Sequence, residues 1–108
     1  MNDFEAPVAP VERTITVGKK TAVYRFTEAS SAVLERLFDV TDANGKVDQD
    51  KSRGIRFRVV AAIVSRQDGT PITVEEAGQM RMAVVNALYK AANETIGSDQ
   101  DADAAGKD

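Results

Sequence analysis

The chain has no cysteine, no histidine and no tryptophan among its 108 residues. Without cysteine there is no disulfide framework, no thiolate nucleophile and no thiolate ligand for zinc or an iron–sulfur cluster. Without histidine there is no imidazole general base and no ordinary transition-metal site. An enzyme would depend on carboxylates, lysine, tyrosine or hydroxyls alone, and no pattern of those groups indicates catalysis. We therefore expect no enzyme activity, no cofactor and no metal.

Long hydrophobic runs are also missing. No apolar stretch approaches the roughly 18 residues of a membrane-spanning helix, and the N-terminus MNDFEAPVAP lacks the basic and apolar regions of a signal peptide. The net charge of −3 gives no overall attraction to nucleic acid or to an anionic membrane. The sequence therefore predicts a protein that stays in the cytoplasm of the cell that makes it and does not contact membranes.

The residues that are present favour one small α+β domain, mainly helical, with an N-terminal β-hairpin packed on about three helices. β-branched and aromatic residues on either side of the turn 18–20 predict a hairpin over 13–26. Residues 1–11 are expected to be a flexible arm. Residues 98–108 have little to bury and are expected to be a disordered acidic tail. The folded domain is thus predicted over 12–97.

Three helices are predicted after the hairpin, over about 28–40, 51–66 and 74–96. The first takes Thr27 as its N-cap and has apolar residues at helical spacing. The second alternates like a strand from Ile55 to Val59, but its length favours a helix. Because its apolar residues cover most of a helical wheel, it is expected to be the central element of the core.

The helix predicted over 74–96 begins with a capping box of Thr73 and Glu76 and is expected to end at Gly97. It carries two apolar stripes whose centres lie about 130° apart. One neighbouring helix cannot cover both, so the second stripe faces either the hairpin and the first helix or another chain. This stripe and the adjacent basic element form the candidate partner-binding surface. Its predicted residues are Arg53, Arg56, Met82, Val85, Tyr89 and Ile96.

Charge is concentrated in two places. Residues 51–66 hold five basic residues and no acid. Three interpretations stay open: arginine stems lying over a core helix, a surface for an acidic protein partner, or phosphate contacts to nucleic acid. The acid-rich loop 39–50 places Gly45 as an EF-hand does, but Val40 and Lys51 occupy the two anchoring ligand positions. A solvated turn is therefore predicted there.

The order of features over residues 53–97 is distinctive. An apolar, arginine-containing helix leads into the turn QDGTPIT at 67–73, and the next helix closes with ANETIG at 92–97. Upstream, YRFTEAS at 24–30 joins the hairpin to its helix. These features resemble the tail assembly chaperones of long-tailed bacteriophages, and the resemblance covers most of residues 14–97. The acid that usually precedes the Asp-Gly pair is Gln67 here.

The resemblance implies a chaperone that binds the long helical tape measure protein and keeps it soluble until the tail tube forms. It implies a protein of the host cytoplasm that is lost from the mature virion. Many members are accompanied by a longer form made by programmed frameshifting. A frameshifted longer form of this chain is therefore an expected partner, and so are further copies of the chain in a homo-oligomer. Two alternatives remain: a small nucleic-acid-binding regulator that uses residues 51–66, and a structural subunit of the tail or its connector.

Overall fold

The computed structural model describes the backbone of residues 9–107 and the side chains of residues 9–96. The described chain is an α+β fold, as the sequence predicts. Its order is β1 (Val11–Val17), β2 (Lys20–Phe26), α1 (Ser31–Phe38), α2 (Gln49–Arg53), α3 (Ile55–Ile63), β3 (Val64–Arg66), α4 (Val74–Gln79) and α5 (Met82–Lys107). Most of the predicted N-terminal arm lies outside the described residues.

The three strands form one antiparallel sheet in the order β1-β2-β3. The predicted hairpin is confirmed, with a register that runs from Val11 opposite Phe26 to Val17 opposite Lys20. Its turn is one residue shorter than predicted, because Lys20 already belongs to β2. Gly18 has φ +63°, a conformation that glycine adopts without a Cβ clash, as two-residue hairpin turns require.

The predicted helix 28–40 begins later, with Ser30 rather than Thr27 as its N-cap. The Ser30 hydroxyl accepts a hydrogen bond from the Val33 backbone N–H at 3.3 Å. The Thr27 backbone N–H instead donates to the Ile63 carbonyl at 2.8 Å. The chain is therefore held extended beside the end of α3 before the helix can start.

The single helix predicted over 51–66 is wrong. The structure divides this segment into α2, the joint at Gly54, α3 and β3. Asp48 caps α2 by accepting hydrogen bonds from the backbone N–H groups of Asp50 and Lys51. Residues 64–66 leave the helix because they pair with the end of β2, where Phe26 lies opposite Val64. The prediction that the middle of the segment is helical and central is confirmed, since α3 contacts α1, α2, α4 and α5.

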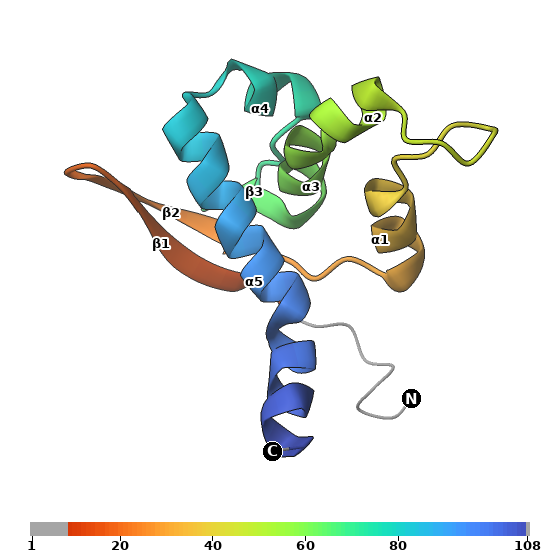
Figure 1. Cartoon of the computed structure of the whole chain (residues 1–108). Helices are drawn as coiled ribbons and strands as arrows, with labels where there is room; N and C mark the ends of the chain where they lie inside the picture. Colours follow the sequence, from red (N-terminus) through yellow and green to blue (C-terminus); the bar gives the residue numbers. More distant parts are fainter. Residues whose placement is uncertain (1–8, 108) are drawn as a thin grey trace.

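The single helix predicted over 74–96 is also wrong, because it is divided into α4 and α5. The capping box of Thr73 and Glu76 is confirmed. Met80 has an extended backbone (ψ 157°) and ends α4. Helix α5 does not end at Gly97, and its backbone remains helical to Lys107, where a disordered tail is predicted. The last turns of α5 extend away from the sheet and the other helices (Figure 1).

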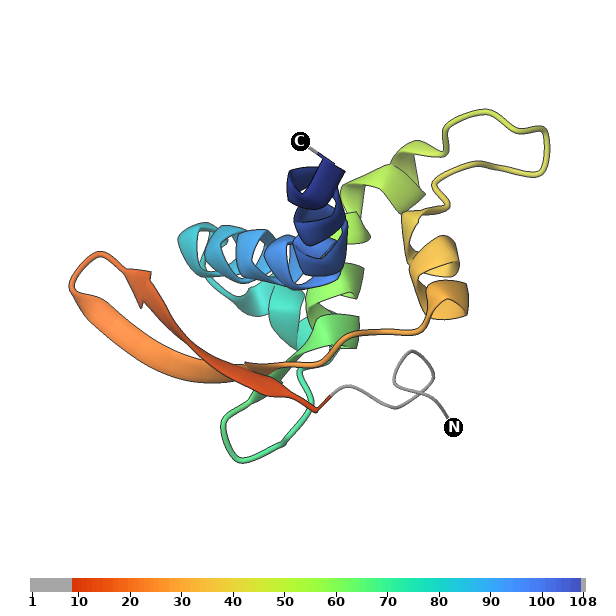
Figure 2. The same cartoon turned by 90° about the horizontal axis from the view of Figure 1, so that it is seen from below.

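The core lies where α3, α4 and α5 meet one face of the sheet. Helix α5 crosses the hairpin on that face and contacts β1 (Figure 1, Figure 2). The buried apolar residues of the described chain are Phe26, Val59, Val60, Ile63, Val64, Ile72, Ala77, Val85, Leu88, Ala91 and Ala92. Within residues 9–107, no helix is both long enough and apolar enough to cross a membrane.

Candidate functional site

An apolar groove lies between the hairpin and the first turns of α5. It has a volume of about 230 Å³. Its walls are the side chains of Ile15, Val17, Ala22, Tyr24 and Val84, and Lys20 and Thr21 line the end nearest the hairpin turn. We call these seven residues the hairpin groove.

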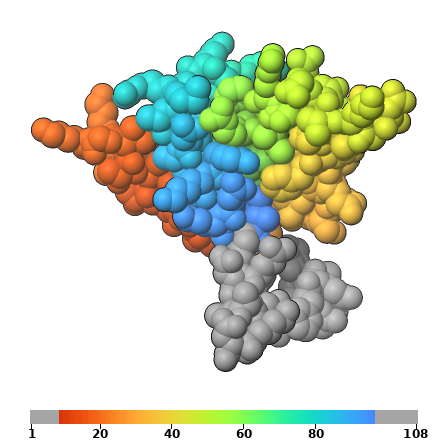
Figure 3. Space-filling model, viewed as in Figure 1, coloured from red at the N-terminus to blue at the C-terminus, as the bar shows by residue number. Residues whose placement is uncertain are grey.

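The strand register builds this groove. Ile15 lies directly opposite Ala22, and Val17 lies opposite Lys20. Because opposed residues of an antiparallel pair point to the same face of the sheet, these side chains form one surface. The turn of the hairpin projects beyond the start of α5, so this end of the surface is not covered by the helix (Figure 1, Figure 3).

Two of the predicted partner-binding residues lie together at the start of α5. Arg56 donates a hydrogen bond from Nη1 to Oδ1 of Asn86 at 2.7 Å, and the same nitrogen lies 3.7 Å from the sulfur of Met82. Met82 is 60% exposed. Arg56 therefore joins α3 to α5, while Met82 remains an exposed apolar side chain beside it.

The other predicted surface residues are distributed differently. Val85 is only 1% exposed, so its assignment to a partner-binding surface is wrong. Tyr89 and Ile96 are half-buried and pack against the core. Arg53 is exposed at the end of α2 and does not line the hairpin groove. Helix α5 contacts both α3 and β1, so both of its stripes meet other parts of the chain, while Met82 remains exposed.

Ile96 contributes to a second apolar depression, between α1 and α5. This depression has a volume of about 430 Å³. It is lined by Ser31, Leu34, Glu35, Phe38 and Ile96. Phe38 is 41% exposed there. The sequence does not predict that Phe38 or the hairpin residues of the groove belong to a binding surface. Alternation along 13–17 places Ile15 and Val17 on one face, but it does not show how far α5 covers that face.

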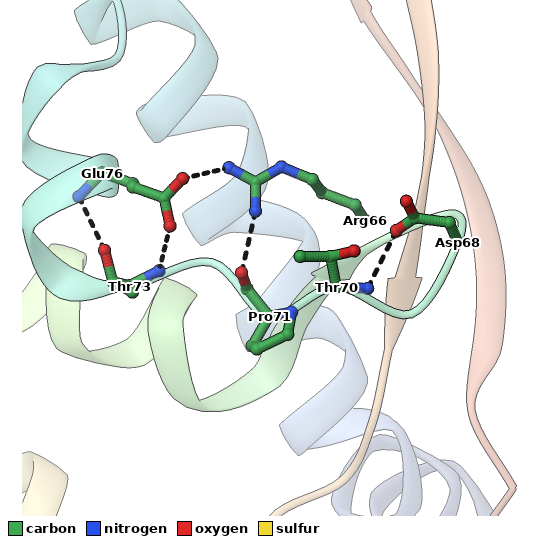
Figure 4. A network of polar contacts seen from close by, with 6 residues as sticks. All are labelled: Arg66, Asp68, Thr70, Pro71, Thr73 and Glu76. Atoms are coloured by element: carbon green, nitrogen blue, oxygen red, sulfur yellow. Dashed lines mark hydrogen bonds and ion pairs between the residues drawn. The ribbon is translucent and has the colours of Figure 1, made fainter.

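The QDGTPIT turn that carries the family resemblance connects β3 to α4. The Asp68 carboxylate accepts a hydrogen bond from the Thr70 backbone N–H at 2.9 Å, which closes the turn (Figure 4). Hydrogen bonds from the Thr70 hydroxyl and N–H lower the pKa of Asp68 below its ordinary value. Pro71 presents its carbonyl to Arg66, whose Nη1 donates to it at 2.8 Å. The motif thus has a structural role in this chain.

The same turn is fixed to α4 through Glu76. One oxygen of Glu76 accepts from the Thr73 backbone N–H at 3.1 Å, and the other accepts from Nη2 of Arg66 at 2.5 Å (Figure 4). These interactions, the Thr73 bond first and the Arg66 bond second, hold the pKa of Glu76 below its ordinary value. Arg66 therefore belongs to this network. At this position of the basic segment 51–66, the arginine has a structural role.

This network predicts a pH-dependent stability. Because the pKa of Glu76 is lower in the folded chain than in the unfolded chain, its stabilisation is complete above the unfolded pKa and is lost as the pH falls towards the folded pKa. The free energy of unfolding should therefore decrease from about pH 6 to about pH 3. Urea unfolding at several pH values should show a smaller decrease for Glu76→Gln than for the wild type. The matched control Glu75→Gln removes a neighbouring carboxylate outside the network, and equal slopes for all three proteins would contradict the prediction.

The acid-rich loop before α2 is a turn, as the sequence predicts. Oδ1 of Asp42 accepts hydrogen bonds from the backbone N–H groups of Asn44 and Lys46. Asp39 binds Thr41, and Asp48 caps α2. Within the described side chains, no group of three carboxylates is placed to hold a metal ion. The carboxylates of this loop are used to shape its backbone.

Protein-family models, curated proteins and solved structures all fail to match this chain. Two depressions beside α5 expose apolar surface, and a few polar groups border them. Such surfaces bind other protein segments by excluding water from apolar side chains.

Proposed function

We propose that this chain is a tail assembly chaperone of a long-tailed bacteriophage, and that it binds a helical segment of the tape measure protein in the hairpin groove. The observation that carries the proposal is the groove itself, in which four apolar side chains of one hairpin face oppose Val84 of α5. The resemblance of the QDGTPIT turn and of the element order to that family supports the choice of partner.

The groove suits one ridge of an amphipathic helix. Such a helix presents apolar side chains at positions i, i+3, i+4 and i+7, and a groove between two elements accepts that ridge while the polar face stays in water. Met82 is not part of this groove, because it lies two positions before Val84 on the other side of α5, beside Arg56.

The same proposal includes the setting of the protein. It acts in the host cytoplasm, as a homo-oligomer or with a frameshifted longer form of itself, and leaves before the virion is complete. Mass spectrometry of purified particles tests this part. Detection of the chain in stoichiometric amounts would instead favour a structural subunit of the tail or connector.

Binding through the groove is tested with Ala22→Glu. Ala22 is exposed in the free domain, so the variant should fold, yet its carboxylate would be buried against the apolar ridge of the partner. We expect the affinity for the tape measure protein to fall by at least about tenfold. Co-expression of the two proteins shows how much tape measure protein stays soluble. Titration of the chain with the tape measure segment that it binds then measures the affinity.

Thr14→Glu is the matched control. Thr14 is exposed on β1 and adds the same charge to the same hairpin, but it does not line the groove. Normal solubilisation by Ala22→Glu, or equal loss in both variants, would contradict the assignment. Binding of the wild type to duplex DNA that weakens steeply with salt would favour the nucleic-acid alternative instead.

A further inference from the structure

A polar depression lies at the corner where α1, α2 and α3 meet, and it shares no residue with the hairpin groove. It has a volume of about 280 Å³ and is lined by Arg36, Asp39, Lys51 and Arg58. These residues come from the last turn of α1, from its C-cap, from α2 and from α3 respectively. We call this depression the basic corner. Three cations and one carboxylate give it a net charge of +2.

The cations of the basic corner are not neutralised by ion pairs. Among the described side chains, the ion pairs within 4.0 Å join Arg13 to Glu94, Arg25 to Glu12 and Arg66 to Glu76. Arg36, Lys51 and Arg58 take part in none of them. Three cations without an ion-pair partner among the described side chains therefore line one depression.

Two of these cations are held in place by backbone oxygens. Lys51 donates from Nζ to the Thr41 carbonyl at 2.8 Å, and Arg58 donates from Nη2 to the Lys51 carbonyl. A backbone carbonyl fixes a cation without cancelling its charge. Each of these side chains also has further N–H donors, since an ammonium has three and a guanidinium five. The positive groups are therefore fixed in place, and each has N–H donors that can bind a further acceptor.

The carboxylate in the corner is already engaged. Oδ1 of Asp39 accepts hydrogen bonds from the Thr41 hydroxyl at 2.6 Å and from the Thr41 backbone N–H at 3.0 Å. Both bonds lower the pKa of Asp39, and the nearby charge of Lys51 lowers it further. Asp39 therefore remains ionised at neutral pH and is directed at the loop, and it offsets only one of the three positive charges.

From this arrangement we infer that the basic corner binds the carboxylate of an acidic side chain presented by a protein partner. A carboxylate accepts hydrogen bonds from arginine and lysine at once, and charge-assisted bonds of this kind are the stronger ones. This inference does not depend on the hairpin groove or on the identity of the tape measure protein as partner.

The surroundings select a single carboxylate over a nucleic acid. Asp42, Asp48 and Asp50 lie on the loop and helix that border the corner. They repel a polyanion, which extends beyond the depression, more than a single carboxylate held at the three cations. Nucleic-acid binding also needs cations spread along one face to follow successive phosphates, whereas these three line one depression.

The test uses the full chain and a small probe of defined charge. The probe is the peptide acetyl-Ala-Ala-Glu-Ala-Ala-amide, and its neutral counterpart has glutamine in place of glutamate. Titration at low ionic strength is followed by amide NMR shifts. With two charge-assisted hydrogen bonds, we expect a dissociation constant on the order of 1 mM for the glutamate peptide. The shifts should centre on the backbone of Arg36, Lys51 and Arg58, and the glutamine peptide should cause none.

Variants identify the side chains responsible. Arg36→Gln should weaken binding of the glutamate peptide about tenfold, because it removes one charge-assisted bond. Lys46→Gln is the matched control, since Lys46 is an exposed cation of the loop before α2 that does not line the depression. It should leave the affinity within about twofold of wild type, as expected for a screened surface charge.

A second variant retains all three cations and changes only the position of the Arg58 guanidinium. A Cβ at Gly54 would lie 2.8 Å from Nη1 of Arg58, so Gly54→Ala must displace that guanidinium. Because Gly54 has a helical φ of −87°, alanine fits the backbone and the domain should remain folded. Weaker binding of the glutamate peptide is expected.

Three outcomes would overturn the inference. The first is equal shifts with the glutamate and glutamine peptides. The second is unchanged affinity in Arg36→Gln, with normal folding confirmed by the NMR spectrum. The third is tighter binding of a short single-stranded DNA than of the peptide at the same amides, which would assign the corner to nucleic acid.

Discussion

Val85→Asp should unfold the domain, whereas Met82→Asp, three positions earlier on α5, should leave it folded. Val85 is 1% exposed, so the carboxylate of an aspartate at this position would be excluded from water. Burying an unpaired carboxylate costs several kcal/mol, which is comparable to the total of about 5–15 kcal/mol that stabilises a domain. The same substitution therefore separates the core face of α5 from its exposed face.

Met82→Asp is the matched control because the side chain is 60% exposed. It is also the first residue of α5, where a negative charge interacts favourably with the helix dipole, and Arg56 lies beside it. Circular dichroism and urea unfolding compare the two variants. A cooperative transition for Val85→Asp at the wild-type midpoint would show that Val85 lies on a free surface, as the sequence predicts.

Phe26→Ala should destabilise the domain by about 3–5 kcal/mol, as expected for removal of a buried aromatic ring. Phe26 is 1% exposed and is the last residue of β2, with Val11 and Val64 opposite it on the two neighbouring strands. The guanidinium of Arg13 lies over its ring, 5.9 Å from the centroid. Loss of this ring therefore weakens the place where all three strands meet the helices.

The control for this prediction is Phe38→Ala, which removes the same side chain from α1. Phe38 is 41% exposed, so its removal should cost less than about 1 kcal/mol. Urea unfolding gives both free energies. Similar losses in the two variants would mean that the core does not centre on Phe26.

Local signals in the sequence explain which elements could be predicted. The hairpin follows from alternation over a few neighbouring residues, and the capping box of Thr73 and Glu76 lies within one turn of helix. Both depend on residues that are close in sequence. The elements that differ depend on distant partners. Residues 64–66 form a strand because the end of β2 lies beside them, and Thr27 is lost as an N-cap because its N–H pairs with Ile63.

In the candidate site, too, features set by residues close in sequence can be predicted, and features set by distant contacts cannot. Helical periodicity correctly places apolar residues on two sides of α5, but it does not show which side the hairpin covers. Val85 is buried, whereas Met82, on the same predicted surface, is exposed. The groove residues Ile15 and Ala22 face each other across the hairpin, and only the position of α5 leaves their surface partly open. The basic corner likewise needs three helices to bring Arg36, Lys51 and Arg58 together.

The pairing of β2 with β3 has a consequence for the order in which the protein forms. β1 and β2 can pair as soon as residues 11–26 are made, but the sheet is completed only by residues 64–66. Its apolar face is then covered by α5, which starts at Met82. The hairpin must wait for the second half of the chain before its core face is sheltered, and contacts of such long sequence separation slow folding. During synthesis on the ribosome, a nascent chain that ends before α5 would lack the helix that contacts β1, and the hairpin would expose more apolar surface to water.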